Sequence, residues 1–262
     1  METSLTEDIP PFIGADLTDR YSPSCRPISV CGMRPYGNRI KAKFWIWTWT
    51  PGPADLSPNG IKQELIKTQV VLLDGPQGVA TAGRKMRDSE RQLCTQAKTG
   101  DTRNTLRDFC KGFVESSLDL FDVILRNKII DPLTRDNRRG IGECYPGHTW
   151  KLLAKQYGKK LVKKDCLEGR KARFCLLRDA FDVDFEPEFG NNSPPSHDQL
   201  DAALGALLAV AVGKGVEGVD PVFFGEQLKL VKKEYLVEGQ IVSVGAKGGT
   251  EVRKSQRLRL FE

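Results

Sequence analysis

The chain has 262 residues, of which 39% are hydrophobic and 28% charged, as is typical of a globular protein with one good-sized core. Its net charge of +6 gives a mild bias towards polyanionic partners. No stretch is apolar enough for a membrane span, and the acidic N-terminus lacks the pattern of a secretory signal. With seven cysteines and no Cys-x-x-Cys pair, we expect reduced thiols and a cytoplasmic location.

The start of the chain predicts three antiparallel strands. Residues 11–15 form a short apolar run that stops at Asp16, as a buried central strand would. Two runs rich in β-branched and aromatic residues follow at 27–33 and 43–49, and the turn-like Pro35-Tyr36-Gly37-Asn38 separates them. We expect these segments to open a mixed α/β sheet.

A crossover helix and a further buried strand are expected next. Residues 55–67 have apolar side chains at helical spacing, and residues 69–73 form a continuous apolar run that leads into Asp74. The stretch 77–111 is polar, rich in glycine and arginine, and without a sustained strand pattern. We interpret it as an inserted loop-and-helix segment over the functional site.

The second half of the chain predicts three helices and two strands. The helices are expected at 113–129, 148–157 and 198–212, and the strands at 140–144 and 239–244. Ser196 is a candidate N-cap for the last helix, whose run of alanine and leucine requires burial. We therefore expect a single domain over residues 1–246, followed by a loosely held tail at 247–262.

Two further patterns have alternative interpretations. Trp45, Trp47 and Trp49 alternate along one predicted strand, so all three point to the same face. They either pack into the core, which is the commoner use, or form a stacking platform for unpaired bases. The basic stretch 151–178 is either a solvated helix face or a surface that binds phosphate groups.

Five carboxylates occur where these elements begin or end. Asp16 and Asp74 follow apolar strands, and ligand sites gather at the carboxyl ends of strands in α/β sheets. Asp198 and Asp201 are three residues apart, so both can point from one helix face, and Glu143 lies at the end of its strand. Each acid alone is also compatible with a turn or a first helical turn. Several buried carboxylates together need a neutralising cation, and Mg²⁺ or Mn²⁺ suits oxygen ligands.

Together these motifs resemble those of a known family. Three antiparallel strands, a helix and a parallel strand, with acids on the first and fourth strands, resemble the ribonuclease H-like fold. The last helix looks like the final helix of Holliday-junction resolvases. The whole pattern is similar to the family called domain of unknown function 429, predicted ribonuclease H-like nucleases. The motifs that carry this resemblance, over about residues 11–245, are Gly14-Ala15-Asp16, Asp74-Gly75-Pro76-Gln77-Gly78, Glu143-Cys144-Tyr145-Pro146 and His197-Asp198-Gln199-Leu200-Asp201-Ala202.

The resemblance implies a metal-dependent nuclease that hydrolyses phosphodiester bonds with Mg²⁺ or Mn²⁺. Two metal ions would clamp the attacking and leaving oxygens of an in-line displacement. Asp16, or Asp19 in its place, would bridge the ions, and Asp74 and Asp198 would complete one each. Three more residues would have supporting roles: Asp201 as a ligand or water-positioning group, Glu143 as a ligand or orienting group, and His197 as an orienting group or proton carrier.

Nucleic acid is the partner that the resemblance implies, either DNA or RNA. Arginines of the insertion are candidates for contacts to the phosphate backbone, because they lie near Asp74 in the sequence and are unsuited to a core. The candidates are Arg84, Arg87, Arg91 and Arg103. Resolvase-like members of this fold often pair, so the resemblance is also compatible with a homodimer.

Two other functions are compatible with the same motifs. One is a phosphotransferase or ATPase of the actin and sugar-kinase type. Such proteins have a Gly-rich hairpin after the first Asp, where this chain has Leu17-Thr18-Asp19-Arg20-Tyr21. The other is a non-catalytic nucleic-acid-binding module that keeps the fold. The presence of all the expected acids favours the nuclease.

Overall fold

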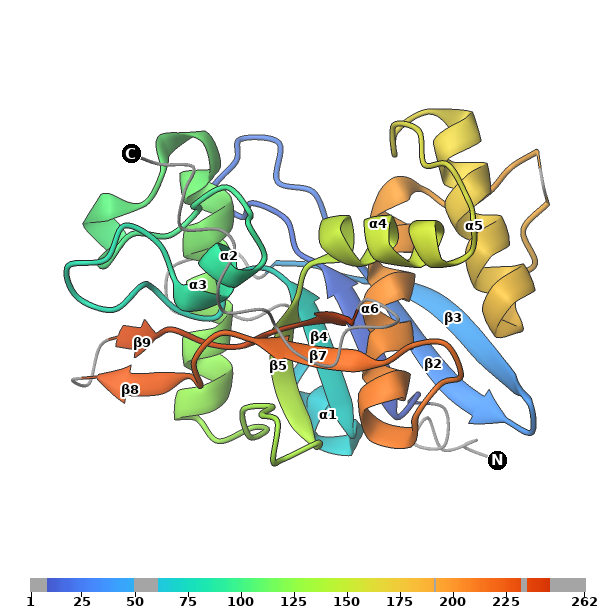
Figure 1. Cartoon of the computed structure of the whole chain (residues 1–262). Helices are drawn as coiled ribbons and strands as arrows, with labels where there is room; N and C mark the ends of the chain where they lie inside the picture. Colours follow the sequence, from blue (N-terminus) through green and yellow to red (C-terminus); the bar gives the residue numbers. More distant parts are fainter. Residues whose placement is uncertain (1–8, 50–60, 191, 232–234, 246–262) are drawn as a thin grey trace.

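The computed structural model describes residues 9–49, 61–190, 192–231 and 235–245. Its centre is an eight-stranded mixed sheet with the strand order β6-β3-β2-β1-β4-β5-β10-β7. Helices flank this sheet (Figure 1), and the prediction of a mixed α/β fold is confirmed. The predicted tail at 247–262 and the first residues of the predicted helix at 55–67 lie outside the described residues.

The bounds of the elements are as follows. The large sheet contains β1 (Phe12–Asp16), β2 (Ile28–Tyr36), β3 (Arg39–Trp47), β4 (Val70–Asp74), β5 (Gly140–Cys144), β6 (Val183–Glu186), β7 (Pro221–Phe224) and β10 (Ile241–Val244). A two-stranded sheet contains β8 (Lys229–Val231) and β9 (Tyr235–Val237). The α-helices are α1 (Ile61–Lys67), α2 (Asp88–Gln92), α3 (Lys111–Arg126), α4 (Pro146–Gln156), α5 (Leu167–Phe181) and α6 (His197–Lys214). Within the described ranges, no helix combines the length and the hydropathy that crossing a bilayer requires.

The first half of the sheet forms as its sequence predicts. β1 pairs antiparallel with β2, and β2 pairs antiparallel with β3 through a turn at Gly37 and Asn38. After α1, β4 runs parallel to β1, with Asp16 directly opposite Asp74 in the register. The residues of β1 are buried, and β4 is buried up to Leu73. Two buried strands therefore end in adjacent carboxylates.

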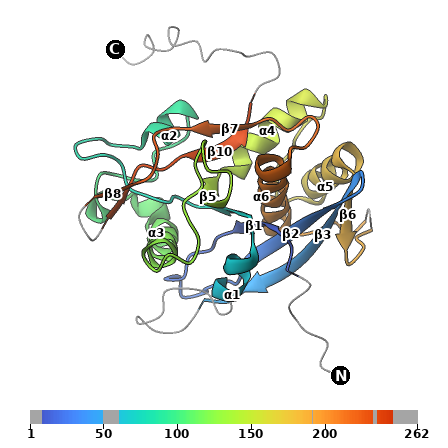
Figure 2. The same ribbon diagram turned by 90° about the horizontal axis from the view of Figure 1, so that it is seen from below.

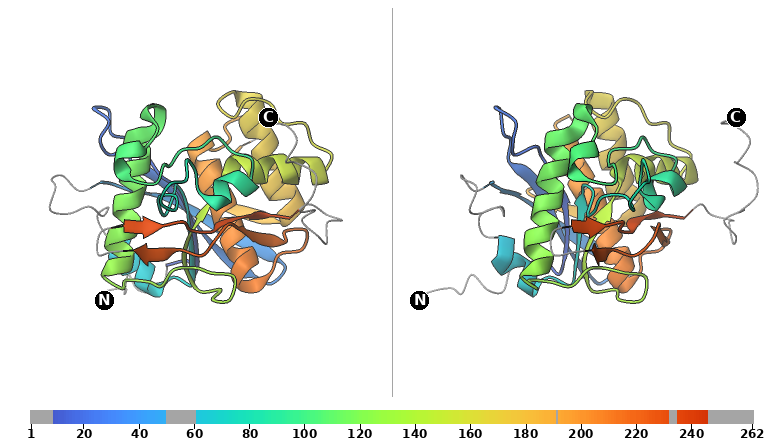
Figure 3. Two further views of the ribbon diagram at one scale, coloured as in Figure 1. Left: turned by 60° about the vertical axis from the view of Figure 1, so that its left-hand side comes forward. Right: turned by 90° about the vertical axis from the view of Figure 1, so that its left-hand side faces the viewer.

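Helices pack two cores against opposite faces of the sheet (Figure 2). On one face, α4, α5 and α6 pack over Phe12 and Leu72, and on the other α1 and α3 pack over Ile13 and Val71. The alternation follows from the two-residue period of a strand. The β8–β9 hairpin lies beside α3 (Figure 3), and Leu236 joins the second core.

The buried helix predicted near the end of the chain is α6. Its N-terminus is capped by Ser196, whose hydroxyl accepts a hydrogen bond from the backbone N of Gln199 at 3.1 Å. The Gln199 side chain accepts one in return from the backbone N of Ser196 at 2.8 Å. All residues from Leu200 to Val212 are buried. The cap therefore fixes where the helix begins, and the apolar run holds it against the sheet.

A Gly14→Ala substitution should separate α6 from β1. A Cβ at Gly14 would lie 2.2 Å from the backbone O of Ala202 and the backbone N of Ala206. Because backbone atoms cannot yield as a flexible side chain can, we expect a loss of about 2–3 kcal/mol in the free energy of unfolding in urea. Gly190→Ala is the control, since nothing lies within 4 Å of its added Cβ. Equal stability of the two variants would contradict this close approach.

Both edges of the large sheet contain strands that the sequence did not predict. β6 pairs parallel with β3, and β7 pairs antiparallel with β10. Each strand has only four residues. In β6, two buried positions alternate with two exposed ones. Runs this short have too little periodicity to be distinguished from loops in the sequence.

The three alternating tryptophans pack inward. The Nε1 atoms of Trp45 and Trp47 donate hydrogen bonds to Glu64 on α1 at 3.0 and 2.8 Å. The Nε1 atom of Trp49 donates to the hydroxyl of Thr18 at 3.0 Å, and both Trp47 and Trp49 are buried. The core interpretation of these residues is therefore confirmed, and the stacking platform is wrong.

Candidate functional site

Four aspartates lie where β1 and β4 end and α6 begins. The parallel register puts Asp16 beside Asp74. Because α6 packs across β1, its first two turns bring Asp198 and Asp201 to the same end of the sheet. Asp16 and Asp201 are only 8% and 4% exposed. The structure thus gathers four of the predicted site residues, from three separate elements.

Burial and the repulsion of neighbouring carboxylates raise the pKa values of Asp16 and Asp74. The pKa of Asp16 lies well above its usual range, first because the side chain is removed from water and then because the other three aspartates lie nearby. Burial also raises the pKa of Asp74 to about 6, although the positive charge of Lys98 opposes this rise. The site therefore concentrates negative charge in a poorly solvated place, which is the electrostatic condition for binding a cation.

Asp198 is held by two neighbouring side chains. Arg26 Nη1 lies 2.9 Å from one of its carboxylate oxygens, and His197 Nε2 lies 2.9 Å from the other. Asp198 also lies near enough to Asp16 to raise the pKa of that carboxyl. Arg26 belongs to the connection between β1 and β2, so the ion pair ties this connection to α6. The contact made by His197 is what an orienting group would make.

Asp201 has both of its oxygens engaged. Trp150 Nε1 of α4 donates to Oδ1 at 2.7 Å, and Lys164 Nζ donates to Oδ2 at 2.8 Å. The guanidinium of Arg173, which is itself buried, lies over the Trp150 ring at 5.8 Å from the centroid. Part of the basic stretch 151–178 is therefore a packed support for Asp201, and the interpretation as a solvated helix face is wrong for Arg173.

Glu143, predicted as a metal ligand or an orienting group, is paired with a buried arginine. Arg87 donates two hydrogen bonds to its carboxylate, at 2.6 Å from Nη1 and 2.8 Å from Nη2, and the backbone N of Gln77 donates a third at 3.1 Å. Arg87 is 1% exposed and also pairs with Glu90 at 3.5 Å. Burial raises the pKa of Glu143, and Arg87 acts against this rise. Glu143 thus anchors the insertion to the sheet.

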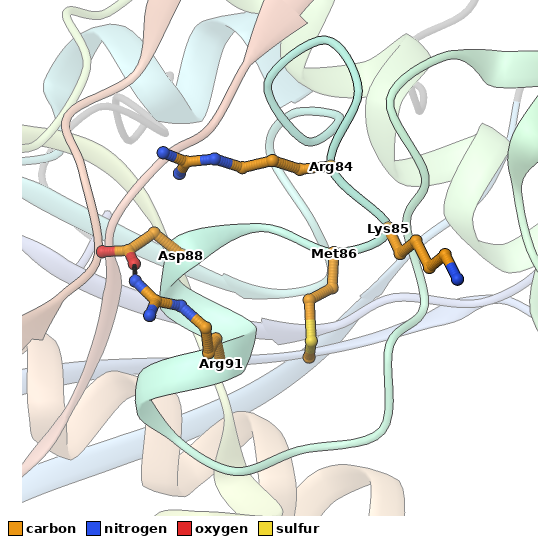
Figure 4. A pocket seen from close by; sticks show the side chains of 5 residues that line it. All are labelled: Arg84, Lys85, Met86, Asp88 and Arg91. Atoms are coloured by element: carbon orange, nitrogen blue, oxygen red, sulfur yellow. Dashed lines mark hydrogen bonds and ion pairs between the residues drawn. The ribbon is translucent and has the colours of Figure 1, made fainter. Parts of the chain in front are cut away.

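The same contacts correct one of the predicted nucleic-acid residues. Arg87 is buried in the Glu143 pair and cannot reach a bound backbone, so its assignment was wrong. The other three candidates are at the surface, each paired with an acid: Arg84 with Glu226, Arg91 with Asp88, and Arg103 with Asp119. Arg84 and Arg91 line a hollow of about 370 Å³ on the insertion, together with Lys85, Met86 and Asp88 (Figure 4).

Asp19 does not take the place of Asp16 in the cluster. Its carboxylate accepts a hydrogen bond from the backbone N of Tyr21 at 2.8 Å. A Cβ at Gly112, at the start of α3, would come within 2.3 Å of the same carboxylate. Asp19 therefore fixes the connection after β1 against α3, while Asp16 lies beside Asp74.

Among the described residues, no three histidine, cysteine, aspartate or glutamate side chains are arranged to hold a metal ion. The partners explain this, because Asp198 and Asp201 direct their oxygens to other side chains and Glu143 binds Arg87. Comparisons with protein-family models, curated proteins and solved structures found no match. Four side chains that hold or face the acids were not predicted as site residues: Arg26, Lys98, Trp150 and Lys164.

An Asp74→Asn variant should be more stable than the wild type in metal-free buffer at neutral pH. With a folded-state pKa of about 6 and an ordinary value of 3.8, the folded protein binds the proton more tightly than the unfolded chain. Stability is therefore lost as the pH rises through the window between these values, by at most about 3 kcal/mol. Urea unfolding with EDTA should show an advantage for Asp74→Asn above pH 6 that shrinks towards pH 4. An advantage independent of pH would contradict the raised pKa.

Proposed function

We propose that the chain is a metal-dependent nuclease of the ribonuclease H-like type, which hydrolyses phosphodiester bonds of nucleic acid. The observation that carries the proposal is the convergence of Asp16, Asp74, Asp198 and Asp201 from β1, β4 and α6. The order β3-β2-β1-β4-β5, with antiparallel pairing up to β1 and parallel pairing from β1 to β5, supports the fold part of the proposal.

The donor set fits Mg²⁺ or Mn²⁺, because these ions prefer carboxylate oxygens, and burial and nearby acids raise the pKa values of Asp16 and Asp74. Two such ions, when bound, would polarise the scissile phosphate and activate the attacking water. The strand register would place Asp16 and Asp74 side by side as ligands of these ions. Asp198 and Asp201 would first exchange the partners Arg26 and Lys164 for the cations. His197 would keep Asp198 oriented.

The test is cleavage of end-labelled single-stranded, duplex, hybrid and branched oligonucleotides in Mg²⁺ or Mn²⁺. Wild-type protein should cut at least one substrate, EDTA should stop the reaction, and Asp74→Asn should be inactive. Asp136→Asn is the matched control, since Asp136 is exposed and the substitution removes the same charge. Equal cutting by wild type and Asp74→Asn would exclude the four-aspartate site as the origin of the activity.

A specific observation favours one alternative, a non-catalytic nucleic-acid-binding module. Arg26 and Lys164 already neutralise part of the charge of Asp198 and Asp201, so the acids have partners without a metal ion. In such a module, Asp74→Asn would leave both oligonucleotide binding and the response to Mn²⁺ unchanged. The nuclease is preferred because Asp16 and Asp74 remain crowded by like charge.

A further inference from the structure

Two lysines approach the four aspartates from different elements. Lys98 comes from the insertion and Lys164 from the connection between α4 and α5, and these two segments lie on either side of the ends of β1 and β4 (Figure 1). The Lys164 ammonium lies 2.8 Å from Asp201 Oδ2, and the Lys98 ammonium lies 5.3 Å from the ring centroid of Tyr145, the residue that follows β5.

Lys98 lies between two aromatic rings and has no acidic partner among the residues that the structure describes. Its ammonium lies 5.3 Å from the ring centroids of both Phe113 and Tyr145. Tyr145 directly follows Cys144, the register partner of Asp74, so the two rings put the charge at the end of β4 and β5. The backbone N of Lys98 donates to the buried Glu90 at 3.4 Å. Across the described residues, Lys98 makes no ion pair within 4 Å, so its charge is available to an anion.

Lys164 lies over Asp201 from the solvent side. Its ammonium is 2.8 Å from Asp201 Oδ2, and its side chain is 50% exposed whereas that of Asp201 is 4% exposed. The connection that contains Lys164 is held by Arg173, whose Nη1 donates a hydrogen bond to the backbone O of Val162 at 3.2 Å. Lys164 can therefore reach both the carboxylate and a group that arrives from solvent.

A phosphodiester that approaches four carboxylates is repelled unless cations face its non-bridging oxygens. A lysine ammonium is a compact point charge suited to that task. We infer that Lys98 and Lys164 bind the phosphate group at the scissile bond, one from each side of the aspartates. The inference rests on the proposed function and deepens it, since the ligand recognised at the site is then the phosphate backbone itself, independent of base sequence.

The experiment measures binding of a fluorescein-labelled DNA duplex, a DNA single strand and an RNA strand by anisotropy. Ca²⁺ replaces Mg²⁺, and gels check that the probes stay intact. Lys98→Met and Lys164→Met should each weaken binding of the probe that wild type binds, by a similar factor for different base sequences. Each should also lower the slope of log K against log salt by about 1, as the loss of one phosphate contact requires.

Lys67→Met is the control, because Lys67 is exposed in the last turn of α1, at the opposite end of β4. Lys98→Arg should keep the wild-type slope, and melting curves show whether Lys98→Met is folded. If wild type binds a probe and both methionine variants keep its affinity and slope, this inference is overturned while the proposed nuclease stands. If wild type binds no probe, both are overturned.

Discussion

An Asp16→Asn variant should lose metal-dependent cleavage by about a thousandfold or more, because a carboxylate that binds the metal ions supports several kcal/mol of transition-state stabilisation. Burial raises the pKa of Asp16, and each of the other three aspartates raises it further. Its replacement removes the ligand proposed to be common to both ions. The measurement is the single-turnover rate on the oligonucleotide that the wild type cuts best.

The fold of Asp16→Asn should be preserved. Asparagine has nearly the same shape as aspartate. The substitution also removes a carboxyl group whose pKa is raised by burial and by repulsion from the other aspartates. We therefore expect an unfolding free energy in EDTA at neutral pH that equals or exceeds the wild-type value. Asp136→Asn should cut at the wild-type rate. A folded Asp16→Asn protein that retained more than about a tenth of the rate would contradict the assigned role.

The second large effect concerns the ion pair that anchors the insertion. Arg87→Met should lower the free energy of unfolding by about 3–5 kcal/mol, because it leaves the buried carboxylate of Glu143 without its partner. Glu90 loses a partner as well. The loss should be greater at alkaline pH than at acidic pH, since protonation of Glu143 removes the unpaired charge. Urea unfolding at one acidic and one alkaline pH measures the loss of unfolding free energy and its dependence on pH.

Two comparisons identify the cause of that loss. Arg91→Met breaks the pair with Asp88, but the Arg91 side chain is 70% exposed, so its cost should stay below about 1 kcal/mol. In Arg87→Met/Glu143→Gln the buried charge is gone, and much of the lost stability should return. If the double variant were as unstable as the sum of the two single variants, packing rather than charge would hold the insertion.

Local patterns in the sequence predict the elements that gather the aspartates. Continuous apolar runs before Asp16 and Asp74 predict β1 and β4, and Ser196 before an apolar stretch predicts the start of α6. Once both strands lie parallel in one sheet, the convergence of their acids follows from geometry. These parts of the site are encoded within short segments, which is why they could be predicted.

Partners that are distant in the sequence could not be predicted in the same way. Arg87 and Glu143 are 56 residues apart, and Lys164 and Asp201 are 37 apart. No periodic pattern links such residues, so Glu143 looked like a free ligand and Arg87 like a surface arginine. Lys98 resembles any lysine of a polar loop until the rings of Phe113 and Tyr145 are seen around it.

Mn²⁺ binding to metal-free protein, followed by the electron paramagnetic resonance signal of the free ion, tests the proposed metal site most directly. Wild type and Asp136→Asn should bind Mn²⁺, and Asp16→Asn and Asp74→Asn should bind it far more weakly. Binding to wild type should also weaken as the pH falls below about 6, because Asp74 must lose its proton to act as a ligand. Failure of the wild type to bind Mn²⁺ at neutral pH, or equal binding by all four proteins, would contradict a metal site built from these aspartates.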